Sequence, residues 1–273
     1  MYETVLADLR ARGYTVTRGE DAGEPPALAT GGDAPAGLGD APLAVEPVGP
    51  DPTELVERAA HGARHDRAVL YVAAPDDAGA VREVIAEPRF VASARDGLRV
   101  FHHVPDRIRL PDDSYAAVRA TPPTPRYGES ARASADRVLA WREEPGDGGE
   151  SRLVLEANRR VVATLGSVDS LTCLDSTDAF PYRYARRDGS FRVRKGDREV
   201  GRFPGVAAMR EGGYMPVPVP LVPEHHLRWG TPAMGLAVAG EGAFATSRSE
   251  SASFPRIGSP GRGVSANRAF SAR

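Results

Sequence analysis

The chain has 273 residues, of which 41% are hydrophobic, so it can bury one large core or two ordinary ones. Its formal net charge of −2 excludes a surface that is basic throughout, the usual sign of a general nucleic-acid binder. Its single cysteine, Cys173, excludes an internal disulfide framework and a cysteine-based zinc site, and it indicates a reducing, cytoplasmic setting.

Neither a signal peptide nor a membrane span is expected. The first stretch, MYETVLADLR, has the pattern of an acidic amphipathic helix and lacks the charged-then-apolar order of a signal peptide. The most apolar late stretch, 229–239, is too short and too rich in glycine to cross a membrane. We therefore expect a soluble protein that makes no contact with a membrane.

Residues 1–120 predict a mixed α/β domain. Apolar residues at helical spacing predict a helix over 3–12, and a strand follows at 14–17. Residues 19–41 contain almost no large apolar side chain, which predicts a mobile loop. The later elements follow in order: a strand at 43–48, a helix opened by Asp51-Pro52, an apolar strand at 68–74, a helix at 78–87 and a strand at 98–104.

Residues 121–150 predict a linker with one short helix at 130–141, ending in a stretch rich in Pro, Gly and acids. A smaller β-rich domain over 151–234 follows, so the predicted fold class is an α/β domain joined to an antiparallel meander with a short helix. Residues 235–273 have seven Ser, no Asp after 240 and no periodicity, which predicts a disordered tail; a frameshifted coding end would have the same composition.

The meander at 180–203 carries the main functional signal. Tyr182 and Tyr184 alternate with Arg183, and Asp188-Gly189 is the dipeptide that a tight hairpin turn prefers. Between 180 and 210 there are nine basic and three acidic residues, a local balance of +6. We predict a binding protein without enzymatic activity, whose basic sheet contacts nucleic acid or an acidic partner through Arg183, Arg187, Arg192, Arg194, Lys195 and Arg198.

A structural alternative explains the same charges. The arginines would then pair with carboxylates of the acidic first domain, or with Glu143, Glu144 and Glu150 of the linker, and each exposed pair would contribute little stability. The binding prediction therefore depends on aromatic side chains that point inward and guanidinium groups that point outward and remain unpaired.

Two resemblances add expectations. The phrases FPYRYARRDGSFRV, GYMPVPVPLVPEHHL and LRVFHHVPDRIRLPDDSYAAVRA resemble a family of uncharacterised proteins from extremely halophilic archaea, over about residues 1–230. That resemblance implies a host and a compartment, and it supplies no catalytic residues.

The order helix, strand, long loop, strand, helix, strand in residues 1–74 resembles the core of restriction-endonuclease-like nucleases. In that family an acid of the loop and a Glu-x-Lys on the next strand hold magnesium, which implies Asp33 or Asp40 and Glu46 here. Pro47-Val48 follows Glu46, so the lysine is missing and the resemblance implies at most an inactive relative. The alternative function is a metal-dependent hydrolase or degenerate nuclease that uses Asp40 and Glu46.

Other candidate sites favour structural explanations. His61 and His65 have the spacing at which two imidazoles share a metal, but two exposed helix histidines are the better prediction. His225 and His226 join Cys173 and Asp175 only if the fold brings these segments together. No glycine-rich phosphate loop follows any predicted strand, and we expect no cofactor and no resident metal.

Overall fold

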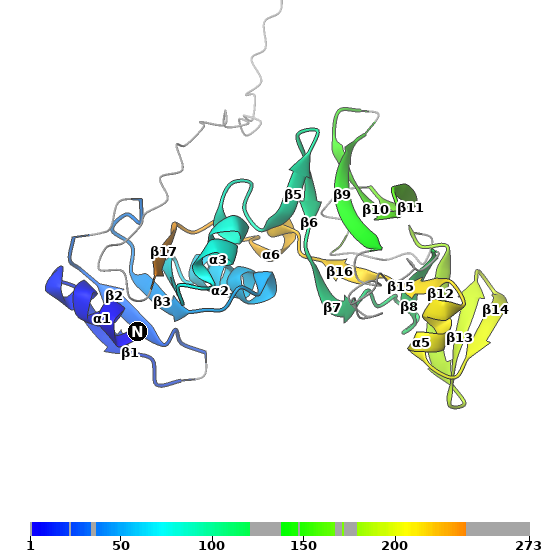
Figure 1. Cartoon of the computed structure of the whole chain (residues 1–273), viewed down its shortest axis with the longest axis horizontal. Coiled ribbons are helices and arrows are strands. Elements are labelled where there is room, and N and C mark those ends of the chain that lie inside the picture. Colours follow the sequence, from blue (N-terminus) through cyan, green and yellow to red (C-terminus); the bar gives the residue numbers. More distant parts are fainter. Residues whose placement is uncertain are drawn as a thin grey trace, which may run out of the picture.

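The structure is a computed structural model of the chain and describes residues 2–21, 23–33, 37–120, 138–146, 148–166, 171 and 179–238. These residues form five helices and seventeen strands in four sheets, which confirms the predicted mixed α and β class. Figure 1 shows an elongated molecule, with the first sheet and its helices at one end and the meander at the other. Within the described residues, each helix is too short or too polar to span a bilayer.

The first sheet has the order β1-β2-β3-β4-β17. Neighbouring strands are antiparallel from β1 to β3, whereas β3, β4 and β17 run parallel. The strands are β1 (Thr15–Arg18), β2 (Ala27–Thr30), β3 (Leu43–Pro47), β4 (Ala68–Ala73) and β17 (Met234–Val238).

Helices cover both faces of this sheet: α1 (Tyr2–Ala11) on one, and α2 (Pro52–Arg64) with α3 (Ala78–Ile85) on the other. All six residues of β4 are buried; Leu70 packs in the cluster under α1, and its neighbour Tyr71 packs in the cluster under α2 and α3. A strand covered on both faces requires such a continuous apolar run, so the prediction from AVLYVA is confirmed. The predicted cap of α2 is also present, because Asp51 accepts a hydrogen bond from the Thr53 amide.

Two predictions for this part of the chain are wrong. The segment 19–41, predicted as a mobile loop, contains β2, whose Ala27 and Ala29 are fully buried under α1. Residues 235–238, predicted as the start of a disordered tail, belong to β17 beside β4; residues 239–273 lie outside the described part. Alanines and a short apolar run give weak sequence signals, and long-range pairing rather than local preference decides their conformation.

A second sheet has the order β11-β10-β9-β6-β5. The predicted linker is wrong here, because residues 139–157 form the hairpin of β9 and β10. Leu139, Trp141 and Glu143 alternate inward with a period of two, a strand pattern that replaces the end of the predicted helix at 130–141; residues 121–137 are not described. The strands are β5 (Val91–Arg95), β6 (Leu98–Phe101), β9 (Leu139–Pro145), β10 (Ser151–Ala157) and β11 (Arg160–Leu165).

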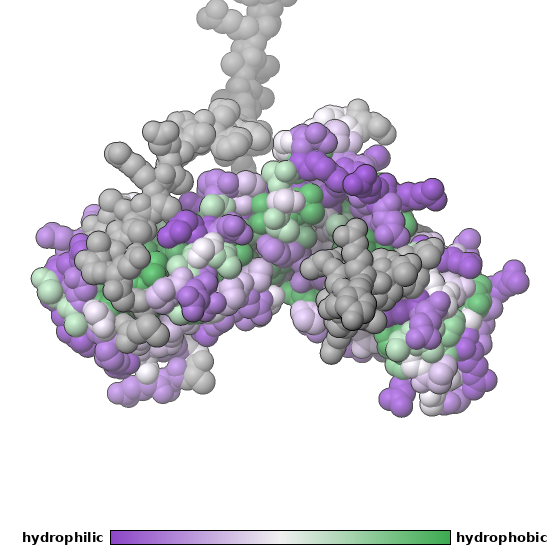
Figure 2. Space-filling view, in the orientation of Figure 1, coloured by the Kyte–Doolittle hydropathy of each residue, from purple (hydrophilic) through white to green (hydrophobic). Residues whose placement is uncertain are grey.

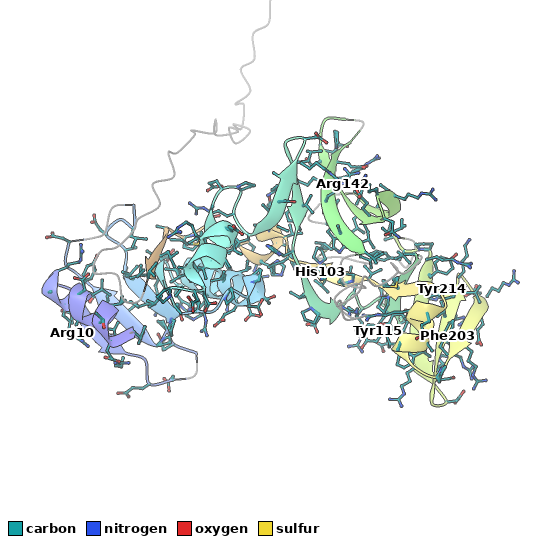
Figure 3. The ribbon with its side chains drawn as sticks, in the orientation of Figure 1. Arg10, His103, Tyr115, Arg142, Phe203 and Tyr214 are labelled. Carbon is teal, nitrogen blue, oxygen red and sulfur yellow. The ribbon has the colours of Figure 1, made fainter. Side chains whose placement is uncertain are left out.

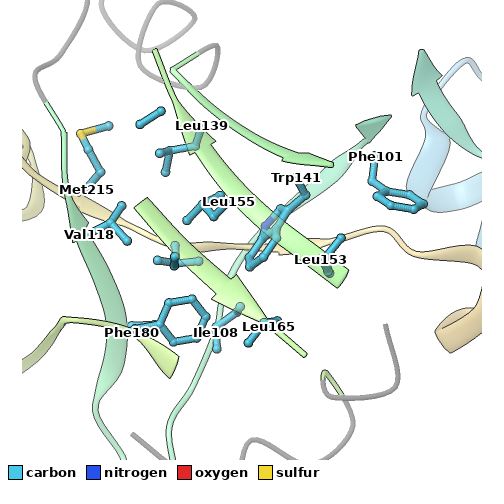
Figure 4. Packing of buried hydrophobic residues seen from close by; sticks show 14 of the residues in the cluster. Phe101, Ile108, Val118, Leu139, Trp141, Leu153, Leu155, Leu165, Phe180 and Met215 are labelled. Carbon is cyan, nitrogen blue, oxygen red and sulfur yellow. The ribbon is translucent and has the colours of Figure 1, made fainter. Parts of the chain in front are cut away.

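Trp141 lies at the centre of the largest core cluster (Figure 4). Its ring is fully buried and packs edge-on against Phe180, with 6.4 Å between the ring centroids. Its Nε1–H donates to the Pro218 carbonyl at 2.9 Å, which satisfies the only polar atom of the side chain. The second sheet is thereby joined to the strand that carries Pro218.

The predicted meander is confirmed as part of a third sheet, β14-β13-β12-β8-β15. Its apolar face carries aromatic rings, among them Phe203 and Tyr214, whose centroids are 5.8 Å apart (Figure 3), and α5 (Val206–Glu211) covers that face with Met209. The strands are β8 (Tyr115–Arg119), β12 (Tyr182–Arg187), β13 (Ser190–Lys195), β14 (Arg198–Phe203) and β15 (Tyr214–Pro216). The strands β7 (His103–Arg107) and β16 (Pro218–Pro220) form a separate two-stranded sheet, and α6 (Pro223–His226) follows β16 in the chain.

Arg99 on β6 connects a buried carboxylate of the second sheet to α6. Glu143 on β9 accepts from Arg99 Nη2 at 2.6 Å and from Arg99 Nε at 3.0 Å, and Arg99 also pairs with Glu224 of α6. Burial alone would raise the pKa of Glu143, but the hydrogen bonds from Arg99 outweigh burial and lower it. The ionised form is therefore the one that the fold stabilises.

We predict that Glu143→Gln lowers the free energy of unfolding by about 2 kcal/mol at neutral pH, because it leaves Arg99 without its main partner. A lowered folded-state pKa stabilises the fold above the unfolded value of about 4.3, and this stabilisation disappears as the pH falls through the folded value. Denaturation of both proteins from pH 7 to pH 3 should show the difference shrinking below about pH 4, whereas the exposed Glu83→Gln should match the parent throughout. A constant difference would contradict the role of the ion pair.

Candidate functional site

The six basic residues predicted to form one face lie on two faces of the third sheet. Cross-strand pairing places Arg183 opposite Arg194, so their side chains share the face away from α5. Lys195 lies on the aromatic face instead, with its Nζ 5.8 Å from the centre of the Tyr182 ring. Arg198 is the cross-strand partner of Lys195 and shares its side. The prediction that Lys195 shares a basic face with the arginines is therefore wrong, and Arg198, predicted as a further contact residue, lies with Lys195.

Arg183, Arg192 and Arg194 on the other face are compensated by nearby acids, whereas Arg187 forms no ion pair with the described residues. Arg183 lies 3.2 Å from a carboxylate oxygen of Asp112 and 3.4 Å from one of Asp197. Arg194 donates to the Asp197 carbonyl oxygen at 2.6 Å. Arg183 and Arg194 therefore already have partners within the chain.

Arg192 is compensated in the same way. It forms an ion pair with Asp188 of the hairpin turn, and its Nη1 lies 3.7 Å from Glu199 on β14. Four arginines and three carboxylates line one shallow hollow of about 260 Å³ here: Arg183, Arg187, Arg192 and Arg194 with Asp112, Asp197 and Glu199. The unpaired stripe on which the nucleic-acid prediction depended is absent from this face of the described sheet.

The compensating carboxylates agree in part with those expected. Asp112 belongs to the predicted first domain, whereas Asp188 and Asp197 come from turns of the meander and Glu199 from β14. Glu143 and Glu144 pair with Arg99 and Arg142 instead. Figure 2 shows hydrophilic side chains over much of the visible surface that is not grey, with hydrophobic ones in smaller patches, which is the pattern of a solvated exterior. Nucleic-acid contact at this sheet stays a prediction.

We predict that removing the compensating charges exposes a basic face. The triple variant Asp112→Asn, Asp197→Asn, Glu199→Gln should tighten DNA retention in mobility-shift assays by about tenfold at low salt, and added salt should abolish the gain. The control Asp76→Asn, Asp77→Asn, Glu83→Gln changes the net charge equally at α3. Equal retention by parent, control and triple variant would show that charge compensation does not limit binding here.

The acids of the nuclease-like alternative lie apart. Asp33 lies near the α1–β1 turn, where its backbone amide donates to the Arg12 carbonyl. Asp33 and Asp40 are both close to Tyr14 of this turn: burial chiefly raises the pKa of Tyr14, and repulsion from the two carboxylates adds to the rise. Glu46 lies at the other end of β3, and the strand from Leu43 to Glu46 alone spans about 10 Å. Among the described residues, no three His, Cys, Asp or Glu side chains are grouped closely enough to hold a metal ion.

The histidines give no metal group either. His61 on α2 and His65 at its C-cap lie side by side with ring centroids 4.5 Å apart, but without a third ligand among the described residues. His226 Nδ1 lies 2.8 Å from the Val222 carbonyl, which can only accept, so Nδ1 carries the hydrogen and Nε2 is left as an acceptor. Cys173 and Asp175, the other members of the predicted cluster, lie outside the described residues.

Glu46 itself is in an unusual environment. Val45 packs under α1, so the next residue, Glu46, faces α2, and its side chain is only 1% exposed. Its Oε2 accepts no hydrogen bond. The nearest cation, Arg58 of α2, has its Nη1 3.6 Å from that oxygen, beyond normal hydrogen-bond length.

Neighbouring donors are already engaged. The hydroxyl of Tyr71, which is paired with Glu46 across β3 and β4, donates to the Leu55 carbonyl at 2.7 Å. The Tyr2 hydroxyl donates to the Val45 carbonyl at 3.0 Å. Burial therefore raises the pKa of Glu46, an effect that Arg58 opposes only in part.

Glu46 lines a hollow of about 480 Å³ between α2, the turn before β2 and α6, which we call the Glu46 hollow. An ion pair of 3.1 Å between Glu24 and Arg67 connects the turn to the residue before β4. The polar residues that the hollow brings together are Glu24, Glu46, Glu57, Arg58, His61, Arg64 and His226. Sequence reasoning missed this group, although a glutamate in the inward register of a buried strand was a usable signal.

Comparisons of the chain with protein-family models, with curated proteins and with solved structures found no match. Function is therefore argued from the geometry of the site alone.

Proposed function

We propose that this protein binds a small polar molecule in the Glu46 hollow. The observation that carries the proposal is the Glu46 carboxylate, which is buried at the hollow with Oε2 lacking any hydrogen bond. A cavity with a few convergent polar groups and a titrating residue of shifted pKa is the usual form of a ligand site. The functional class remains the one predicted from sequence, a binding protein, but its site moves from the meander to the first sheet.

Stability alone gives no reason for this glutamate. An unsatisfied buried polar atom costs roughly 1–3 kcal/mol, and more if it is charged. The attraction of Arg58 offsets only part of this free-energy penalty, because the Arg58 side chain is 40% exposed and its distance to Glu46 is too long for a hydrogen bond. A ligand that donates to the Glu46 carboxylate would satisfy it, so the arrangement has the form expected of a site prepared for such a group.

Binding fits this geometry better than the metal-dependent alternative. Asp40 and Glu46 lie toward opposite ends of β3, and valine occupies the position where the nuclease family has lysine. Burial raises the pKa of Glu46, but the described hydrogen bonds connect its carboxyl group to no nucleophile and no second catalytic group. The residues of the Glu46 hollow supply recognition groups and no complete catalytic set.

We predict that Glu46→Gln stabilises the protein by about 1 kcal/mol at pH 7, because it removes a buried charge and keeps the shape. A raised folded-state pKa favours the protonated form, so the cost of Glu46 is absent below the unfolded value of about 4.3 and grows as the pH rises toward the folded value. Thermal unfolding at pH 3.5 and pH 7 should therefore show the gain at pH 7 only. Destabilisation at pH 7 would mean that the fold needs the carboxylate.

The binding itself is tested by ligand-observed NMR with amino acids, nucleobases and polyamines as separate probes of the full chain. Probes that bind should lose about tenfold or more in affinity with Glu46→Leu, which removes every polar atom at the buried position. Glu57→Gln, a change at the exposed rim of the same hollow, should leave affinity nearly unchanged. No bound probe, or binding that is insensitive to Glu46→Leu, would overturn the proposal.

A further inference from the structure

The ion pair at the Glu46 hollow lacks hydrogen bonds at both of its contacts. Arg58 Nη1 lies 3.6 Å from Glu46 Oε2, and Nη2 lies 3.7 Å from Glu54 Oε1. Both distances exceed the range of N–H···O hydrogen bonds. A carboxylate acceptor and guanidinium donors therefore lie side by side at the Glu46 hollow, each with hydrogen-bonding capacity to spare.

From this pair we infer the chemical class of the ligand, an inference that rests on the proposed function. The ligand is a neutral molecule with an amide-type edge, in which an N–H donor sits next to a carbonyl or ring-nitrogen acceptor. Its N–H donates to the Glu46 carboxylate, and its acceptor receives a hydrogen bond from Arg58. One ligand edge satisfies both groups at once.

Charge balance excludes simple ions. Glu46 and Arg58 are only 3.6 Å apart. A cation beside Glu46 would therefore be repelled by Arg58, and an anion beside Arg58 would be repelled by Glu46. Glu24 is likewise compensated by Arg67 at 3.1 Å. The remaining charged groups of the hollow, Glu57 and Arg64, are exposed and of opposite sign. The lining itself holds three glutamates and two arginines, and its charges balance when Arg67, the partner of Glu24, is counted with them.

A zwitterion has both functions, but it fits less well than an amide. Its ammonium and carboxylate would each lose water on entering a site where Glu46 is already 99% shielded, and desolvating full charges costs far more than desolvating an amide. A primary amide also has a second N–H. His226 also lines the hollow, and because its Nδ1 lies on the Val222 carbonyl, Nε2 is the ring nitrogen left for a ligand.

The test uses two substitutions that separate charge from hydrogen bonding. Glutamine at position 46 keeps a carbonyl acceptor but no charge, whereas leucine keeps neither. An amide ligand should therefore bind Glu46→Gln within about threefold of the parent and Glu46→Leu about tenfold or more weakly. A cationic ligand would lose comparable affinity with both.

The probes are acetamide, acetate, methylammonium and glycine, each titrated into the ¹⁵N-labelled full chain while the amide signals of Ala60, His61 and His226 are followed. Acetamide alone should give saturable shifts at these signals, reduced in Glu46→Leu and retained in Glu46→Gln. Saturable binding of methylammonium or glycine that is lost in both variants would overturn the amide assignment and leave the Glu46 hollow as a ligand site. Acetamide shifts that persist in Glu46→Leu, or no saturable shift with any of the four probes, would overturn the assignment of this site to an amide.

Discussion

One constraint determines the site. The helix α2 connects the parallel strands β3 and β4, and this pairing turns Glu46 of β3 toward α2. Residues along a strand alternate between faces, so the burial of Val45 under α1 forces Glu46 under α2. There the Tyr71 hydroxyl is already bonded to the Leu55 carbonyl. The carboxylate is left with one distant guanidinium and with the hollow, and these two facts define the proposed site.

This arrangement also explains why a costly group can persist in a stable fold. The apolar clusters on both faces of the first sheet are extensive, and β17 from the far end of the described chain closes one side of the sheet. A core of that size tolerates one unfavourable polar atom, and such local costs are typical of sites under functional constraint. A position retained for binding is expected to be improvable for stability.

Sequence predicted the elements whose signals are local. The capping pair Asp51-Pro52, the apolar run of β4 and the turn Asp188-Gly189 each specify their element within a few residues, and each is present. The strands β2, β9 and β17 were missed because their stability comes from partners elsewhere: buried alanines under α1, a hairpin with β10, and parallel pairing with β4. Such non-local pairing leaves little trace in a short window of sequence.

For the candidate site, sequence named Glu46 but assigned it the wrong companions. Alternation correctly placed Arg183, Arg192 and Arg194 on one face. Asp188 and Asp197, whose sequence pattern indicates only turns, are partners of these arginines. A tight turn brings its acidic residue next to the strand residues that flank it, and residue counts along the chain do not show this. The contact of Glu46 with Arg58, and the presence of His226 in the same hollow, follow from packing alone.

The most direct test of this account is the pKa of the Glu46 side chain, measured by ¹³C NMR titration of its carboxyl signal in the full chain, with Glu46→Gln used to assign the signal. The account predicts a value clearly above the ordinary glutamate value of about 4.3, because the buried carboxylate lacks a hydrogen bond. A value at or below the ordinary one would show that Glu46 is already satisfied within the protein, and it would contradict the proposal that the hollow awaits a ligand.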